Sequence, residues 1–234
     1  MRPVQRGPVP EANGVPKTYS AYGDARDGLI ARLGDYCSYC ELPCHDGPAV
    51  EHVQPKGGSH GRPELELIWD NFLLGCRYCN SVKRDTPVNL SDFFWPDQDN
   101  TFRAFTYETD RAPQPAAGLS PLERAQAERT LRLTGLDREP SHPNLTPKDR
   151  RWLKRREAWG KAIISFGDLQ RSPSEAMRCQ IVLNALGTGF WSVWMTVFSG
   201  DRDMLRRFVA SFVGTERACF DADMNPVLRA SGRL

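Results

Sequence analysis

The sequence predicts an α+β protein in which a small zinc-stabilised module is followed by a mainly α-helical region. Two C-x-x-C pairs, Cys37/Cys40 and Cys76/Cys79, lie in the first half of the 234 residues. Between the two pairs lies a short segment that is expected to form a strand, and Pro55 is expected to end it. From Ser120 onward, apolar residues recur at helical spacing.

The composition is that of an ordinary globular chain, with 40% hydrophobic and 26% charged residues. The formal net charge of +2 does not by itself indicate a nucleic-acid partner, so any basic surface must be local. No apolar stretch follows the N-terminal arginines, and the longest apolar run, Phe190 to Phe198, is too short to span a bilayer. We therefore expect a cytoplasmic protein.

The first elements are expected in and around the module. Residues 1–18 are rich in Pro and Gly and predict a flexible tail, or an arm ordered only by a partner. The module is expected over residues 19–107, with a flanking helix from Asp24 to Leu33 that stops at Gly34. Aromatic residues from Thr101 to Tyr107 predict a strand at its end.

A linker over residues 108–120, rich in Pro, Ala and Gly, is expected to lead into a helical region over residues 121–234. Its first helix has a capping-box pattern, Ser120-Pro121-Leu122-Glu123, and should stop at Gly135. Further helices are expected over Pro147–Phe166, from the Ser172-Pro173-Ser174-Glu175 capping pattern to about Gly187, over Phe190–Phe198 and over Asp201–Val213.

The cysteines indicate a metal site. Seven cysteines in a chain without a secretion signal argue against a disulfide scaffold. The thiolates of Cys37, Cys40, Cys76 and Cys79 fit tetrahedral Zn²⁺ in a closed, structural site. Cys44 or His45 could compete as ligands.

The loop between the two cysteine pairs contains Glu51 and His52. Neighbours in a strand point to opposite faces, so both can serve one site only where the strand bends or ends, as Pro55 suggests. A histidine can deprotonate water near neutral pH, and a carboxylate is a hard ligand for Mg²⁺ or Mn²⁺. An isolated Glu-His pair is more often a surface pair, but its place inside the zinc loop favours a site.

A short helix is expected to start after Cys79. On it, Asn80, Lys83 and Arg84 have the spacing of one helical face. Asn80 offers an amide oxygen to a metal, and Lys83 or Arg84 could bind a phosphate. Without the rest of the motif, an asparagine cap and two solvated basic residues would be the simpler interpretation.

Together these motifs resemble the HNH nuclease superfamily, whose members have a ββα-metal fold. The strings are C-x-Y-C-E, E-H-x-x-P-K and W-D-N-x-L-L-x-C-x-x-C-N, with His52, Asn71 and Asn80 in the order of the family motif. Asn80 stands where the family name has its final histidine. More narrowly, the strings resemble the HNH subunit of Septu-type antiphage systems and nucleases associated with retrons. Those relatives are usually paired with an ATPase, and this chain has no phosphate loop of its own.

The resemblance implies a role for each matching residue. His52 would be the general base, Glu51 and Asn80 would hold one catalytic Mg²⁺ or Mn²⁺, and Asn71 would fix the loop that orients His52. Lys83 would contact substrate phosphate. The four paired cysteines would bind a structural Zn²⁺, and the substrate would be DNA.

A basic stretch, residues 148–161, offers a second candidate DNA contact. On a helix it would place Lys148, Arg151, Lys154 and Arg155 opposite two tryptophans. The alternative is a solvated face whose tryptophans pack in the core.

Three functions remain open from the residues. The favoured one is a DNA endonuclease of defence or restriction, controlled by an ATPase partner or by homo-oligomer formation because a free nuclease is toxic. The second is a non-catalytic zinc-containing module that binds nucleic acid or protein. The third is a homing or recombination nuclease, which needs a sequence specificity that the motif cannot encode.

Overall fold

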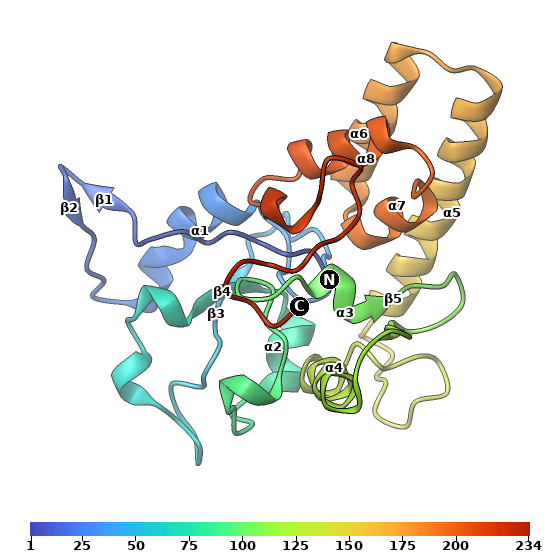
Figure 1. Ribbon diagram of the computed structural model, residues 1–234. Helices are drawn as coiled ribbons and strands as arrows, with labels where there is room; N and C mark the ends of the chain where they lie inside the picture. The colour runs from blue at the N-terminus through green and yellow to red at the C-terminus, as the bar shows by residue number, and fades with distance from the viewer.

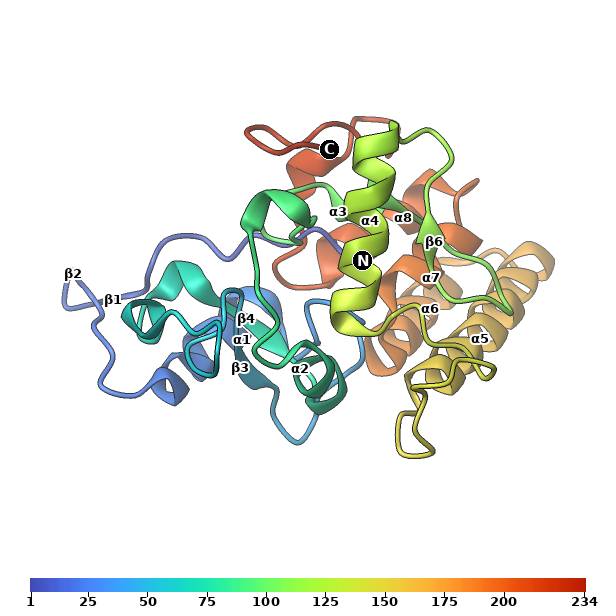
Figure 2. The same cartoon turned by 90° about the horizontal axis from the view of Figure 1, so that it is seen from below.

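The computed structural model describes all of residues 1–234 as an α+β protein with small sheets and many helices (Figures 1 and 2). Three two-stranded antiparallel sheets are present: β1 with β2, β3 with β4, and β5 with β6. The strands are β1 Glu11–Ala12, β2 Val15–Pro16, β3 Ala49–His52, β4 Phe72–Gly75, β5 Phe105–Thr106 and β6 Gln114–Pro115. The helices are α1 Arg26–Leu33, α2 Arg77–Lys83, α3 Thr101–Ala104, α4 Pro121–Thr134, α5 Arg151–Arg171, α6 Glu175–Thr188, α7 Trp191–Val197 and α8 Arg202–Ser211.

The segment that carries the motif folds as two strands followed by a helix. β3 and β4 pair so that His52 faces Phe72 at one end and Ala49 faces Gly75 at the other. Cys76 follows β4 directly and caps α2, since its sulfur accepts a hydrogen bond from the Cys79 amide. The second cysteine pair therefore lies at the start of α2, and His52 lies at the far end of the hairpin.

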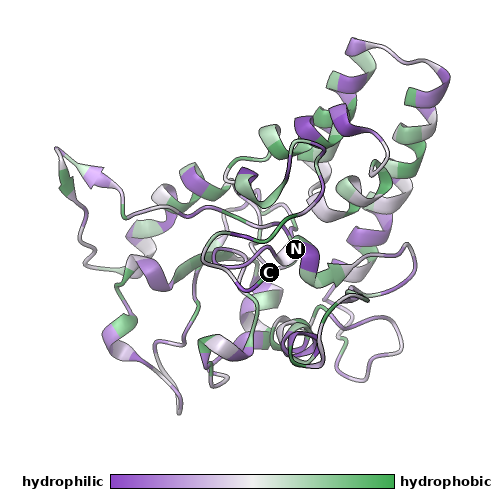
Figure 3. Ribbon diagram, in the orientation of Figure 1, coloured by the Kyte–Doolittle hydropathy of each residue, from purple (hydrophilic) through white to green (hydrophobic).

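The second half of the chain is mainly helical. α5 and α6 form a long antiparallel pair that projects from the body, with hydrophobic residues extending along it (Figures 1 and 3). α7 packs against α5, and α8 packs against α6. No helix combines the length and the apolar character needed to cross a membrane.

One hydrophobic core of 47 buried residues runs through both halves. It joins the apolar strand β4 and the paired cysteines to the buried aromatic residues of α7, among them Trp191 and Trp194. α4 also packs directly on α2. The expected module and helical region thus share one core, and the boundaries of the module, linker and helical region remain a prediction.

Within the expected tail over residues 1–18, most of the first six residues pack into the folded body, while residues 7–18 are exposed or half-buried. Met1, Arg2, Val4 and Arg6 are all buried. Arg2 donates hydrogen bonds to main-chain oxygens of α1 and of the segment after α8, and Arg6 pairs with buried Asp97 at 2.9 Å. Composition alone predicted disorder, because it contains no information about contacts with residues that are distant in the sequence.

The expected strand over Thr101–Tyr107 is largely a helix. α3 takes up its first four residues, and only Phe105 and Thr106 extend into β5. Asn100 precedes α3, and its side-chain amide donates to the main-chain oxygens of Cys219 and Val227. These tertiary bonds anchor the start of the segment and override its local strand preference.

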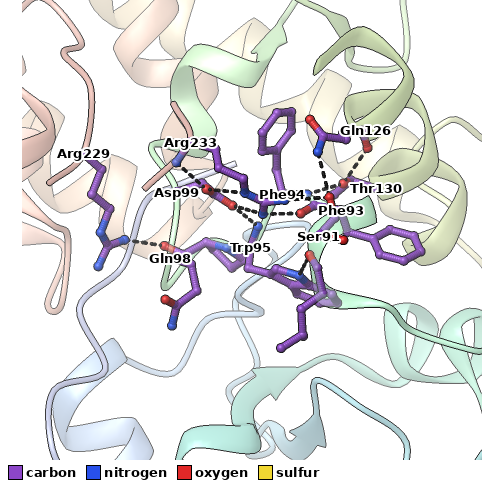
Figure 4. A network of polar contacts seen from close by, with 12 residues as sticks. Ser91, Phe93, Phe94, Trp95, Gln98, Asp99, Gln126, Thr130, Arg229 and Arg233 are labelled. Carbon is purple, nitrogen blue, oxygen red and sulfur yellow. Dashed lines mark hydrogen bonds and ion pairs between the residues drawn. The ribbon is translucent and has the colours of Figure 1, made fainter. Parts of the chain in front are cut away.

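A polar network ties the segment before α3 to the C-terminal residues and to α4 (Figure 4). The Arg233 guanidinium pairs with buried Asp99 at 2.8 Å, and Asp99 also accepts from the Trp95 amide. One residue earlier, the Phe94 amide donates to the Thr130 hydroxyl of α4. The C-terminal residues are therefore part of the folded body.

The ends of α4 follow the sequence signals, whereas those of α5 and α6 are shifted from the expected positions. The Ser120–Glu123 capping box is present, and α4 stops at Gly135 in the left-handed conformation, with φ 64°. α6 begins at Glu175 with Ser174 as its cap, two residues later than the expected Ser172. α5 begins at Arg151, after the expected start at Pro147, and extends to Arg171.

Candidate active site and metal centre

The four paired cysteines meet in one buried cluster. The Sγ atoms of Cys37, Cys40, Cys76 and Cys79 all lie within 4.8 Å of one another. A tetrahedral zinc site with Zn–S bonds of about 2.3 Å needs sulfurs about 3.8 Å apart. The Cys40–Cys76 sulfur distance of 3.6 Å fits this spacing. These four buried cysteines could hold zinc.

The chemistry of the cluster also fits a cation. Burial raises the pKa of the Cys40 thiol well above its usual range, so a buried group of thiolates needs nearby positive charge. Cys44, the alternative ligand, lies outside the cluster and donates weakly to the Leu42 main-chain oxygen at 3.4 Å. Cys44 is close in sequence to the first cysteine knuckle (Cys37 and Cys40). Its sulfur nevertheless does not lie with the four clustered sulfurs of this knuckle and the second one (Cys76 and Cys79).

Arg151 supplies part of that positive charge. Its guanidinium donates to Cys79 Sγ at 3.0 Å and to the Thr134 main-chain oxygen at 2.7 Å, and it pairs with Asp149 at 2.7 Å. The side chain is buried, as is that of Arg155, whose guanidinium lies over the Phe190 ring. The expectation that Arg151 and Arg155 contact DNA is therefore corrected: both face the protein interior.

The rest of the basic stretch is partly neutralised. Lys154 is exposed but pairs with Glu157 at 2.8 Å, and Arg156 pairs with Asp110 at 3.2 Å. Lys148 is exposed and has no ion pair. In this basic stretch, a DNA contact remains a prediction only for Lys154 of α5 and for Lys148, which lies just before the helix.

His52 is held with one ring nitrogen free. Its Nε2 lies 2.9 Å from the Glu66 main-chain oxygen, which can only accept, so Nε2 carries the proton and Nδ1 keeps its lone pair. Burial lowers the pKa of His52, which favours the neutral imidazole at neutral pH. Phe72 and Tyr22 pack edge-on around the ring. This is the state that a general base requires.

Asn71 fixes the loop that holds His52. Its buried amide accepts from the Gln54 main-chain N–H at 2.8 Å and donates to the Gln54 oxygen at 2.9 Å and the Leu65 oxygen at 3.3 Å. Leu65 precedes Glu66, the residue that receives the His52 hydrogen bond. Asn71 thus joins the two ends of the loop around His52.

Glu51 lies next to His52 and is neutralised by a lysine. The Lys83 ammonium lies 2.9 Å from the Glu51 carboxylate and donates to the His52 main-chain oxygen at 2.6 Å. Burial raises the pKa of Glu51, and the charge of Lys83 opposes that rise. Lys83 is 1% exposed, so the expected contact of Lys83 with DNA phosphate is corrected: its side chain points inward and locks α2 onto β3.

The catalytic candidates line one pocket. Glu51, His52, Asn80 and Arg84 all border a cavity of about 360 Å³ at the end of the hairpin. β3 and α2 carry most of these residues. They converge at the pocket because β4 pairs with β3 and then leads directly into α2. A carboxylate oxygen and an amide oxygen at one pocket form a donor set that suits a hard divalent cation.

Sequence reasoning missed Tyr22 and the role of Lys56 in this pocket. The Lys56 ammonium lies 3.8 Å from the centre of the Tyr22 ring and pairs with the Glu66 carboxylate at 2.7 Å. Lys56 belongs to the E-H-x-x-P-K string, so the motif could have identified it. Nothing in the sequence near Tyr22 indicates its place beside His52.

Comparison with known proteins gives one informative relative. No protein-family model matches the chain. A protein of Vibrio cholerae serotype O1 biovar El Tor, named "Retron Vc95 putative HNH endonuclease", is 26% identical over 121 residues. The match covers 48% of this chain, which spans 57% of the relative's length.

Proposed function

We propose that this protein is a metal-dependent DNA endonuclease of the HNH type. The observation that carries the proposal is the pocket in which Glu51, His52 and Asn80 meet, with a free His52 Nδ1. The helix α2, which supplies Asn80, begins at the four-cysteine cluster. The distant relative named as an HNH endonuclease supports the same superfamily and a nuclease function in general.

In the proposed reaction His52 removes the proton from the attacking water. Its Nδ1 accepts that proton, while the Nε2 hydrogen bond to Glu66 stabilises the imidazolium that forms. Asn71 maintains the ring position through the loop. The water oxygen then forms a bond to phosphorus, and the bond from phosphorus to the leaving oxygen breaks.

Glu51 and Asn80 would hold the catalytic metal. A bound Mg²⁺ or Mn²⁺ would stabilise negative charge at the phosphate and at the leaving oxygen. The four cysteines would hold Zn²⁺ without an open position, and this site would support the fold. Arg84, at the rim of the same pocket, would face the phosphate backbone.

The biological setting is part of the same proposal. The resemblance to Septu-type and retron nucleases favours a role in antiphage defence, with an ATPase partner or self-association controlling cleavage. The relative is likewise named as a retron protein. The alternative is a non-catalytic zinc-containing module that binds nucleic acid or protein.

Nicking of supercoiled plasmid with Mg²⁺ or Mn²⁺ tests the activity. The wild-type chain should cut, and His52→Ala should lower the rate by about 100-fold or more, because loss of a general base has effects of that size. His142→Ala, a histidine outside the pocket, is the matched control and should leave the rate unchanged.

The outcomes separate the two functions. Equal cutting by His52→Ala and wild type would contradict the assigned base. If neither cuts, even with a candidate ATPase partner added, while both retard DNA in a gel, the binding-module alternative is correct.

A further inference from the structure

A second cavity lies beside the proposed active site. It has a volume of about 840 Å³ and lies between the outward face of α2 and the loop over residues 42–47 that follows the first cysteine knuckle. Asn80 and Arg84 line both this cavity and the smaller active-site pocket. The two hollows are therefore adjacent, with Asn80 and Arg84 at their shared border.

The sequence of α2 separates its two faces. Cys76, Cys79 and Lys83 form the buried face, which holds the thiolates and the contact with Glu51. Arg77, Asn80 and Ser81 follow at i, i+3 and i+4 on the outward face, and Arg84, the residue that ends the helix, lines the cavity with them. The exposed face of this short helix is thus polar and carries two positive charges.

Those two arginines have no acidic partner. Neither Arg77 nor Arg84 makes an ion pair, although many other arginines of the chain do. The Arg77 guanidinium lies 4.7 Å from the centre of the Tyr78 ring and donates to its hydroxyl at 2.7 Å. The Arg84 guanidinium donates only to the Ser81 main-chain oxygen. Asp46 is the sole carboxylate among the lining residues.

Arginines without an acidic partner favour a polyanionic ligand. Here they lie next to the pocket in which cleavage of a phosphodiester is proposed. Arg77 lies three residues from Asn80, about 4.5 Å along the helix axis. A DNA strand has one phosphate per about 3.4 Å of its axis, so the Arg77 guanidinium can reach a phosphate one or two nucleotides from the one at Asn80. Tyr78 holds the guanidinium in place by stacking.

We propose that this cavity is a subsite for the cleaved DNA strand and that Arg77, positioned by Tyr78, binds a phosphate that flanks the scissile one. This inference rests on the proposed nuclease function, because that function defines which phosphate lies at Asn80. Arg77 is then a binding residue, and Arg84 bridges the subsite and the active-site pocket.

The salt dependence of DNA affinity tests the inference. Binding of a labelled duplex is measured by fluorescence anisotropy at several NaCl concentrations, with zinc-loaded protein and no added Mg²⁺ or Mn²⁺. Loss of one phosphate contact lowers the slope of log affinity against log salt by about 0.9. Arg77→Gln should show this decrease and a several-fold weaker affinity at low salt.

Arg171→Gln is the matched control, since it removes the same charge from an exposed arginine at the end of α5, remote from α2. Its slope should equal that of wild type. If Arg77→Gln and Arg171→Gln behave alike while wild type binds and cuts DNA, the subsite is wrong and the nuclease function stands. If Arg77→Gln lowers the slope but wild type never cuts, the subsite stands as a DNA contact and the proposed catalysis fails. No DNA binding by wild type overturns both.

Discussion

Lys83 illustrates how one side chain can be assigned opposite roles from sequence and structure. Its spacing from Asn80 suggested a phosphate contact, yet its ammonium is buried between the Glu51 carboxylate and the His52 main-chain oxygen. Spacing shows which residues share a helix face, but the whole fold decides whether a side chain on that helix is buried or exposed. The carboxylate that would bind the metal is therefore balanced by an internal cation that also holds the end of β3.

Replacing that cation should destabilise the protein. In Lys83→Met, Glu51 would be left as an uncompensated buried carboxylate, and breaking a buried pair this way costs about 3 kcal/mol or more of unfolding free energy. Urea unfolding followed by circular dichroism measures this. Lys154→Met, which breaks the exposed pair with Glu157, should change the free energy of unfolding by less than about 1 kcal/mol. Equal effects of the two variants would contradict the role assigned to Lys83.

At the scale of elements, Arg151 joins three parts of the chain. It is the first residue of α5, it donates to the main-chain oxygens of Thr134 and Gly135 at the end of α4, and it donates to Cys79 at the start of α2. These contacts connect the cysteine cluster to the helical half. A residue expected on the DNA surface instead links the cysteine cluster to α4 and α5.

Arg151→Met should therefore weaken zinc binding. Removing a hydrogen bond to a metal ligand typically lowers metal affinity about 10-fold or more. Competition with a chromophoric chelator gives the zinc affinity, and thermal melting should show a lower midpoint. Arg150→Met, which changes the exposed neighbour, is the control. A zinc affinity equal to that of the control would show that the Cys79 hydrogen bond has no influence on the metal.

The elements that sequence predicted well are those with local signals. The α4 capping box and its glycine stop depend on residues within one turn, and both are present. The four-cysteine cluster followed from the spacing of the two pairs. The strand expected over 101–107 failed because Asn100 bonds to segments more than 100 residues away.

At the scale of the molecule, hydrogen bonds connect both cysteine knuckles, or the residue next to them, to the helical half. Arg151 contacts the second knuckle. Glu41, which directly follows the first, accepts a 2.6 Å hydrogen bond from the Ser192 hydroxyl of α7, and its main-chain oxygen accepts from the Phe190 amide. Gly189 permits this approach, because a Cβ there would lie 2.7 Å from the Glu41 oxygen. Composition suggested a linker between two regions and could not reveal these contacts or the shared core.

Because both knuckles are connected to the helical half by these hydrogen bonds, we expect loss of zinc to affect the whole chain. A strong zinc chelator should lower far-ultraviolet circular dichroism over the temperature range in which the zinc-loaded protein stays folded, since binding energy at a structural zinc site contributes to folding. Cys79→Ser should reproduce this loss of helix signal without chelator. Cys44→Ser should not, because its sulfur lies outside the cluster. If the chelated protein keeps its full helix signal and melting temperature, the α5–α7 region is held by the apolar core alone, and the metal stabilises only the hairpin and α2. A loss of helix signal larger than α2 can account for would instead show that the contacts at Arg151 and Glu41 transmit the effect of zinc to the helical half.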